Sequence, residues 1–476
     1  MIKKISNKNI LFALSLMLLW SCTPTLNMAK KENKQTPDSY GYTQDIANCA
    51  NHNWREYFAD SHLAALIDTA LNNNQELNIL MQEIEISKNE VYARKGEYLP
   101  FVGIGAGAGL EKPGAYTRDG AVEESLEIKH GTKFPEPLTD YMFGAYAKWE
   151  VDIWKKLRNA KKSAVMRYLA SNEGKNFMTT NLIAEIAETY YELLSLDNHL
   201  NIIGQNIEIQ SNALRVVKHL KDAAKVSQLA VNRFEAQLLN TQNLQYEIRQ
   251  KIIEKENRIN FLTGRFPQPI QRDAAIFNDL TLDTAVEGIP SQLLINRPDI
   301  RQAELELEAA KLDIKVARAN FYPNFGISAG VGFQAFNPAF LIQPKSLLYN
   351  LAGDLMAPLI NRNAIKATYF NANAKQIQAV YNYEQTILNA YIDVLNQVSK
   401  LDNFAKSYAT KSQEVELLVQ SVTIANSLFN SARADYGEVL FTQREALEAK
   451  MDLIEIKTKQ LNGKVNIYRA LGGGWK

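Results

Sequence analysis

The clearest hydrophobic pattern in the chain lies between Asn296 and Phe333, where a helical period gives way to an alternating one. Pro298 suits the first turn of a helix, where a missing N–H costs nothing, and Asp299 favours the positive end of the helix dipole. Good helix formers then continue without interruption as far as Pro323. Beyond it, apolar residues alternate with glycine and serine, which predicts a strand with one apolar face and one face almost without side chains. A helix that leads directly into such a strand suggests that the strand belongs to a membrane barrel.

The same pattern occurs 223 residues earlier, with Pro100 matching Pro323 and Gly103 matching Gly326. In each copy a variable loop leads to a second alternating stretch. The four predicted strands cover residues 101–110, 141–153, 324–333 and 347–359. Four strands cannot close a barrel, and open sheet edges are prohibitive in lipid. Several copies of the chain would therefore have to close a barrel together.

A very long helical region follows each pair of strands, at residues 157–220 and 363–429. About sixty residues in a helix span about 90–100 Å. Apolar residues in both regions recur at alternating steps of three and four, which indicates a coiled-coil seam. Shorter helices follow at residues 227–264 and 435–472, and these align without a gap at an offset of 208. An ordinary helical bundle is the alternative, but it would not explain the alternating strands.

The start of the chain is basic, then apolar, and ends in Leu-Trp-Ser-Cys at Cys22. This pattern predicts a signal peptide over residues 1–21, a lipid on the new N-terminal Cys22, and a polar tether over residues 22–53. Ordinary signal cleavage near Cys22 is the alternative, because Trp20 is unusual before a lipidated cysteine. Two cysteines form no disulfide framework, so Cys49 is a lone thiol.

The repeats define the remaining boundaries. We expect a first structural repeat over residues 54–265, a linker over 266–290 that contains proline and glycine, and a second structural repeat over 291–474.

Composition excludes several function classes. The 476 residues include 53 Lys plus Arg and 52 Asp plus Glu, and loss of residues 1–21 removes three lysines, which leaves 50 against 52, or −2. The chain therefore has no excess of positive charge that would favour binding to nucleic acid. The sequence has five histidines and no paired metal-ligand spacing, phosphate loop or nucleophile elbow, so we expect neither an enzyme nor a metal site. No apolar stretch of about 20 residues could span a membrane as a helix.

Three motifs resemble those of the TolC-like outer-membrane factors, in the lipoprotein branch that serves RND-type efflux pumps. They are NRPDIRQAE from Asn296, ARANFYPNFGISAGVGF ending at Phe333, and YRALGGGW from Tyr468 to Trp475. The resemblance implies a mainly α fold with a small β part, in which three chains close a barrel of twelve strands. It also implies a homotrimer in the outer membrane of a Gram-negative bacterium, with its helical part in the periplasm. Its partners would be a periplasmic adaptor and an inner-membrane RND pump, and its role that of a passive exit duct with no cofactor except the lipid on Cys22.

The family also points to a gate at the second helical turn. This branch commonly has L-D-A-Q-R there, with the Asp and the Arg in the constriction, and the matching stretch here runs from Leu440 to Arg444 with Phe441 in place of the Asp. We therefore predict a gate of three Phe441 rings in which Arg444 pairs with Glu438 or Asp435. The alternative is that Phe441 is a seam residue that packs on a neighbouring helix.

The two helical turns are also where the family docks its adaptor. Ala223, Ala224, Ala432 and Ala434 would allow close approach there, and the family often has glycine where this chain has Ala224 and Ala432. These segments could instead be merely turns.

Three other functions stay open at this stage. The same fold could conduct secreted proteins or peptides, because the pump chooses the cargo. A coiled-coil scaffold tethered through Cys22 would have no pore, and a periplasmic enzyme would need a site that we do not find. Neither a methionine-rich lining nor a histidine cluster supports metal export.

Overall fold

The computed structural model describes residues 29–41, 47–48, 50, 52–280, 288–431 and 433–475. It divides into two compact units. The sheet unit comprises Met1–Lys31, Glu85–Leu169 and Leu305–Tyr381, and the helical unit comprises Glu32–Ile84, Ala170–Glu304 and Asn382–Lys476. Cys22, Cys49 and Ala432 lie outside the described residues.

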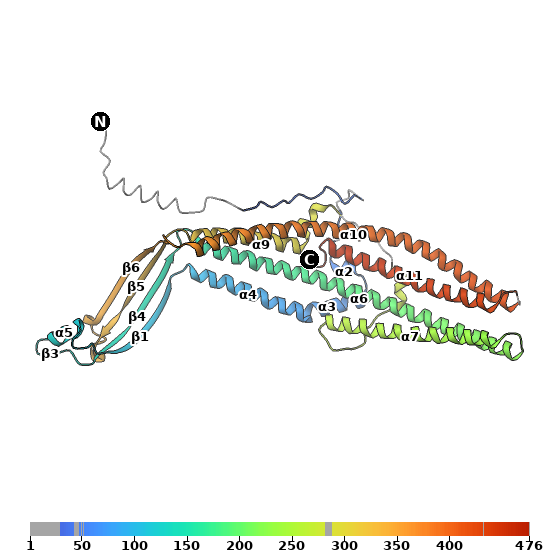
Figure 1. Cartoon of the computed structure of the whole chain (residues 1–476), viewed down its shortest axis with the longest axis horizontal. Coiled ribbons are helices and arrows are strands. Elements are labelled where there is room, and N and C mark those ends of the chain that lie inside the picture. Colours follow the sequence, from blue (N-terminus) through green and yellow to red (C-terminus); the bar gives the residue numbers. More distant parts are fainter. Residues whose placement is uncertain are drawn as a thin grey trace, which may run out of the picture. The chain divides into compact units, whose positions relative to one another are not determined.

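Long helices and four main strands make up the fold (Figure 1). The helices are α2 (Trp54–Tyr57), α3 (Ser61–Asn73), α4 (Gln75–Glu97), α5 (Arg118–Ser125), α6 (Lys156–Asp222), α7 (Gln228–Leu262), α8 (Leu293–Asn296), α9 (Pro298–Ala319), α10 (Asn363–Asn430) and α11 (Tyr436–Ala470). The main strands are β1 (Phe101–Glu111), β4 (Leu138–Val151), β5 (Asn324–Ala335) and β6 (Leu347–Met356). This confirms the predicted mainly α fold with four strands in the chain.

The loop between the first two main strands has structure that the sequence did not predict. It contains α5, whose N-terminus is capped by the Thr117 side chain, and a small hairpin of β2 (Glu127–Lys129) and β3 (Thr132–Lys133).

The four main strands form one antiparallel sheet in the order β1-β4-β5-β6. Its register places Val102 opposite Ala147, Ala147 opposite Ala329, and Ala329 opposite Leu351. Directly opposed residues share a face, so the four predicted apolar stripes all lie on one side of the sheet. That side carries Val102, Ile104, Ala106, Ala108, Leu110, Tyr141, Phe143, Ala145, Ala147, Trp149, Val151, Phe325, Ile327, Ala329, Val331, Phe333, Leu347, Tyr349, Leu351 and Leu355.

The opposite side of the sheet is mostly glycine and polar residues. It includes Gly103, Gly105, Gly107, Gly109, Asp140, Lys148, Glu150, Ser328, Asn350 and Asp354. At its centre Gly144 opposes Gly332, and a Cβ added to Gly144 would lie 2.6 Å from the Val331 carbonyl oxygen. Glycine therefore lets the backbones of β4 and β5 approach closely across the junction between the repeats.

In the first repeat, the end of α7 packs against the α3–α4 junction. Gly264 has φ +67° and ends the helix, and a Cβ added to it would lie 2.3 Å from the carbonyl oxygen of Asn73. The buried Asn74 side chain donates a hydrogen bond of 2.9 Å to the Leu262 carbonyl. An otherwise unpaired carbonyl in the last helical turn thus gains a donor.

The second repeat builds the same contact with different side chains. Gly472 has φ +86°, and a Cβ there would lie 2.5 Å from the Asn296 carbonyl oxygen. The buried Arg297 guanidinium donates a hydrogen bond of 2.9 Å to the Ala470 carbonyl and forms an ion pair with Asp299 at 2.7 Å. Asn296 and Arg297 begin the NRPDIRQAE motif, and their role here is to hold the end of α11.

The start of the described chain is more than a polar tether. The backbone N–H of Lys30 and its carbonyl bond to the Gln376 side chain at 3.1 and 2.8 Å. Further along, Tyr40 is only 3% exposed and stacks on Tyr391 with ring centroids 5.5 Å apart. The sequence prediction did not anticipate this packing, because a single aromatic residue in a polar segment gives no periodic signal.

We predict that Gly264→Ala destabilises the protein by about 2–4 kcal/mol, because the new Cβ combines a left-handed backbone with a collision against Asn73. The matched control is Gly204→Ala, where a Cβ in the middle of α6 would meet no atom within 4 Å. It should stabilise α6 by about 1 kcal/mol. Denaturant midpoints followed by circular dichroism test both, and equal midpoints for the two variants would contradict the proposed contact.

Candidate functional site

The turn between α6 and α7 has the hydrogen bonds of a Schellman motif. The Lys225 N–H donates to the Leu220 carbonyl at 2.9 Å, and the Ala224 N–H donates to the Lys221 carbonyl at 2.8 Å. Ala224 has φ +55°, in the left-handed region that favours glycine. This chain therefore keeps a glycine conformation with an alanine, while Ala223 and Ala224 are both exposed.

The turn between α10 and α11 ends in a side-chain cap. The Arg433 N–H donates to the Leu428 carbonyl at 2.8 Å. The Asp435 carboxylate accepts from the N–H groups of Gly437 and Glu438 at 2.5 and 3.1 Å, which caps α11 at its positive end. Ala434 is half-buried, and Ala432 lies outside the described residues.

An apolar cluster ties these turns together, and we call it the tip cluster. Its buried members come from α6 and α7, and Tyr436 and Leu440 of α11 pack against them. The buried residues are Leu214, Val217, Ala230, Val231 and Phe234. The two helical turns are thus packed as one apolar group in the helical unit.

Phe441 points away from this cluster. Its side chain is 51% exposed, whereas the neighbouring Leu440 packs on the tip cluster. Within the described chain Phe441 is thus not a core residue, and its ring is accessible from outside the chain.

Arg444 does not pair as the sequence predicted. Its guanidinium lies 5.4 Å from the centroid of the Phe441 ring, and its Nε is 3.8 Å from Glu448 Oε1. The reason is helical geometry: Glu448 is one turn away on the same face, whereas Glu438 is six residues away and Asp435 caps the helix.

Two buried amides lie one helical turn beyond the tip cluster. Gln443 and Gln210 are 4% and 1% exposed. Among the described residues, neither Gln443 Oε1 nor either polar atom of the Gln210 amide has a hydrogen-bond partner. Such groups cost stability, so the packing just beyond the tip cluster is weaker than in an apolar core.

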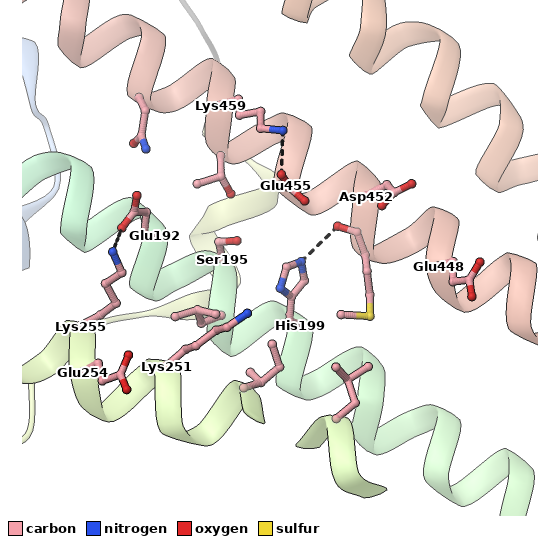
Figure 2. A pocket seen from close by; sticks show the side chains of 16 residues that line it. Glu192, Ser195, His199, Lys251, Glu254, Lys255, Glu448, Asp452, Glu455 and Lys459 are labelled. Carbon is pink, nitrogen blue, oxygen red and sulfur yellow. Dashed lines mark hydrogen bonds and ion pairs between the residues drawn. The ribbon is translucent and has the colours of Figure 1, made fainter. Parts of the chain in front are cut away.

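A cleft of about 650 Å³ lies further along the helical unit, between α6, α7 and α11 (Figure 2). Charged side chains line it from all three helices. Lys255 pairs with Glu192 across α7 and α6, and Lys459 pairs with Glu455 at 2.7 Å within α11.

His199 of α6 closes one side of this cleft. Its Nε2 lies 3.1 Å from the Met451 carbonyl oxygen of α11, as Figure 2 shows. Burial of the ring lowers the pKa of His199 from its usual value. The nearby charge of Lys251 lowers this pKa further, whereas those of Glu455 and Asp452 raise it. The neutral ring therefore donates through Nε2 and links two helices. Sequence reasoning missed it, because one histidine on a helix has no spacing signal.

The described residues contain no group of three or more His, Cys, Asp or Glu side chains arranged to hold a metal ion.

None of the described helices is both long enough and apolar enough to cross a membrane.

Comparison with known proteins places the chain among transport proteins. The family model described as "Outer membrane efflux protein" matches residues 66–265 and 289–473. The pyoverdine export outer membrane protein OpmQ of Pseudomonas putida is 27% identical over 471 residues, which cover 98% of this chain and 97% of the relative. The solvent efflux pump outer membrane protein SrpC of Pseudomonas putida is 25% identical over 431 residues, 88% of this chain and 87% of the relative.

Solved structures agree on the fold. The open state of the MtrE outer membrane channel of Neisseria gonorrhoeae has a TM-score of 0.82 and 20% identity, and the match covers 95% of this chain and 98% of that chain. The two long helices and four strands described above therefore have the fold of that solved chain.

We predict that Ala224→Gly stabilises the α6–α7 hairpin by about 0.5–1 kcal/mol, because glycine removes the left-handed strain at that position. Ala223→Gly is the control, since Ala223 precedes the left-handed residue and should gain nothing. Chemical unfolding midpoints of the two variants test this. An equal or lower midpoint for Ala224→Gly would show that the turn carries no strain.

We predict that acidification weakens the α6–α11 contact through His199. The pKa of His199 is lower in the folded than in the unfolded protein, so the neutral ring contributes its full stability only above about pH 6.5. This stability is lost as the pH falls through the pKa of the unfolded state and then that of the folded state. His199→Gln keeps a donor near Met451 but does not titrate, so it should lose less thermal stability between pH 7.5 and 5.5. His219→Gln, an exposed position on the same helix, should behave as the parent does. A parent and a His199→Gln variant with parallel pH profiles would contradict this.

Proposed function

Because the chain belongs to the outer membrane efflux protein family, and is thus a transport protein of the outer membrane, we propose that three copies form the exit duct of a tripartite RND-type efflux system. The duct is passive. An inner-membrane pump supplies the energy, and a periplasmic adaptor connects the pump to this chain. The helical part lies in the periplasm, and a lipid on Cys22 adds an anchor.

The amphipathic sheet is the observation that carries this proposal. One face is apolar across all four strands, and the other is mostly glycine and polar. Among the described strands, β1 pairs only with β4 and β6 only with β5, so both edges of the sheet are open. Open edges are prohibitive in lipid, which favours closure with further copies. Three copies would supply twelve strands, with the glycine-rich face toward a wide, wet lumen.

The helical turns are where we propose control of the duct. The exposed ring of Phe441 would narrow the pore in three copies, with Arg444 against its face and Glu448 beyond. Asp435 and Glu438 would shape the start of α11 rather than neutralise Arg444. The adaptor would dock at Ala223, Ala224, Ala432 and Ala434, where small side chains allow helices to approach closely.

Cargo is left to the pump in this proposal. One relative is named for pyoverdine export and another for solvent efflux, and both match this chain over most of its length. A duct for protein secretion would use the same architecture, and no observation favours it. A tethered, non-conducting scaffold would leave the apolar face of the sheet without a purpose.

The first experiment is planar-bilayer conductance of the purified mature protein, combined with its mass in the same detergent. A particle of trimeric mass that forms channels supports the duct. A monomer without conductance would overturn it in favour of the scaffold.

We predict that Phe441→Ala raises the leak of the closed channel several-fold, because three rings are removed from the narrowest level. Phe261→Ala is a matched control, since Phe261 is 55% exposed on α7 and carries the Arg258 guanidinium at 5.2 Å from its ring. It should leave the leak unchanged. An unchanged closed-state leak in Phe441→Ala would mean that Phe441 is a packing residue.

A further inference from the structure

Two helices of the sheet unit, α6 and α10, begin with positive charge. Between Ile153 and Asn172 the chain has six cations and no acid, and between Ala357 and Tyr383 it has three cations and no acid. Neither helix has an acidic residue in its first turn. The N-terminal end of a helix is itself positive and favours anions. The Asp152 carboxylate, just before α6, accepts from the N–H groups of Leu157 and Arg158 at 3.1 and 2.9 Å and so caps this helix. The cations within these two ranges have no acid beside them in the sequence, which favours an external anion.

The two helix starts lie at the same end of the sheet. Val151 at the end of β4 is opposite Phe325, and Phe325 is opposite Leu355 near the end of β6. Both junctions also line one cavity of about 430 Å³, to which Lys156 and Ile365 contribute. The cations at the starts of α6 and α10 thus lie at the same end of the sheet, and we treat them as one group.

Aromatic and apolar side chains border this group. Trp154 stacks on Tyr322 with ring centroids 4.6 Å apart, and its Nε1–H donates a hydrogen bond of 2.7 Å to the Pro323 carbonyl. Ile153 and Leu359 are exposed nearby. Amphipathic aromatic rings between an apolar band and charged residues are typical of a membrane–water interface.

Some of these cations are already neutralised and others are not. Lys156 pairs with Glu150, and Arg167 pairs with Asp313. By contrast, Lys155, Lys162 and Lys366 form no ion pair with any residue that the structure describes. All three are exposed.

Lys155 also has an unusual backbone. Its φ is +57°, and Asn361 at the second strand-to-helix junction has φ +52°. Asparagine tolerates the left-handed region better than lysine does. At equivalent turns the chain therefore uses asparagine once and a strained lysine once, which is explained if the charge of Lys155 is needed.

We propose that Lys155, Lys162 and Lys366 form a cationic collar that binds the phosphate groups of anionic phospholipids at the membrane surface next to the sheet. The collar rests on the proposed function, which puts the sheet in the membrane and the helices in the periplasm. Its ligand is the anionic headgroup of the periplasmic leaflet, such as phosphatidylglycerol. Electrostatic attraction of basic residues to such a surface falls within a Debye length, so only cations next to the apolar band contribute.

Tryptophan fluorescence tests the collar directly, because Trp149 and Trp154 lie on or beside the strand that leads into α6. The mature protein in a non-ionic detergent is titrated with brominated phosphatidylglycerol or brominated phosphatidylcholine, which quench tryptophans that they contact. We expect about a fivefold preference for phosphatidylglycerol at low salt. The preference should shrink in salt, since the charges are exposed.

The decisive variant is Lys155→Asn with Lys162→Gln and Lys366→Gln. It relieves strain at residue 155 and removes three charges, so it should fold and form channels in phosphatidylcholine bilayers as the parent does. Its lipid preference should fall below about twofold. The matched control replaces Lys221, Lys225 and Lys400 of the helical unit by Gln, which removes the same charge and should keep the full preference.

Several outcomes would overturn the collar. These are equal quenching by the two lipids in the parent, an equal loss of preference in the control variant, and selective competition by inorganic phosphate against chloride at the same ionic strength, which would indicate a site for free phosphate. The two proposals fail separately. Channels without lipid preference reject only the collar, and lipid preference without channels rejects only the duct.

Discussion

The helical unit depends on two places where backbones touch with no side chain between them. At Gly264 and at Gly472, the end of a returning helix lies against the carbonyl of Asn73 or Asn296 so closely that a single Cβ would collide. Such an approach fixes where each short helix stops and from which direction the next segment arrives. The tip cluster and the cleft beside His199 both include side chains of α7 and α11, the two helices whose ends are set at these contacts.

A second constraint acts in the sheet, where one register decides the chemistry of two faces. Moving any strand by one residue would exchange its apolar and glycine-rich sides. The close approach at Gly144 and Gly332 fixes the register of β4 and β5 at the boundary between the repeats. Charged residues such as Lys148, Glu150 and Asp354 then fall together on the glycine-rich side, away from the continuous apolar side.

Much of this could be predicted from the sequence, because periodicity and repetition are strong local signals. The alternation around Gly326, the two long heptad regions and the matched glycines at 264 and 472 were enough to predict the strands, the helices and their duplication. Pairing between side chains could not be predicted in the same way. Arg444 lies beside Glu448 because of helical phase, His199 is linked to a carbonyl with no sequence signature, and Tyr40 is buried by residues more than three hundred positions away.

The bond between Trp154 and Pro323 crosses from one repeat to the other. So does the uninterrupted pairing between β4 and β5 in the sheet. A half-length chain would therefore lose both its neighbouring strand and the partner of its tryptophan. It could recover them only from another half-length chain, and a ring of six such halves would satisfy every edge that three full chains would satisfy in the proposed trimer. Joining the two halves in one polypeptide lets the sequence of each repeat change independently of the other. Asn74 and Arg297, at matching positions of the two repeats, already differ in this way.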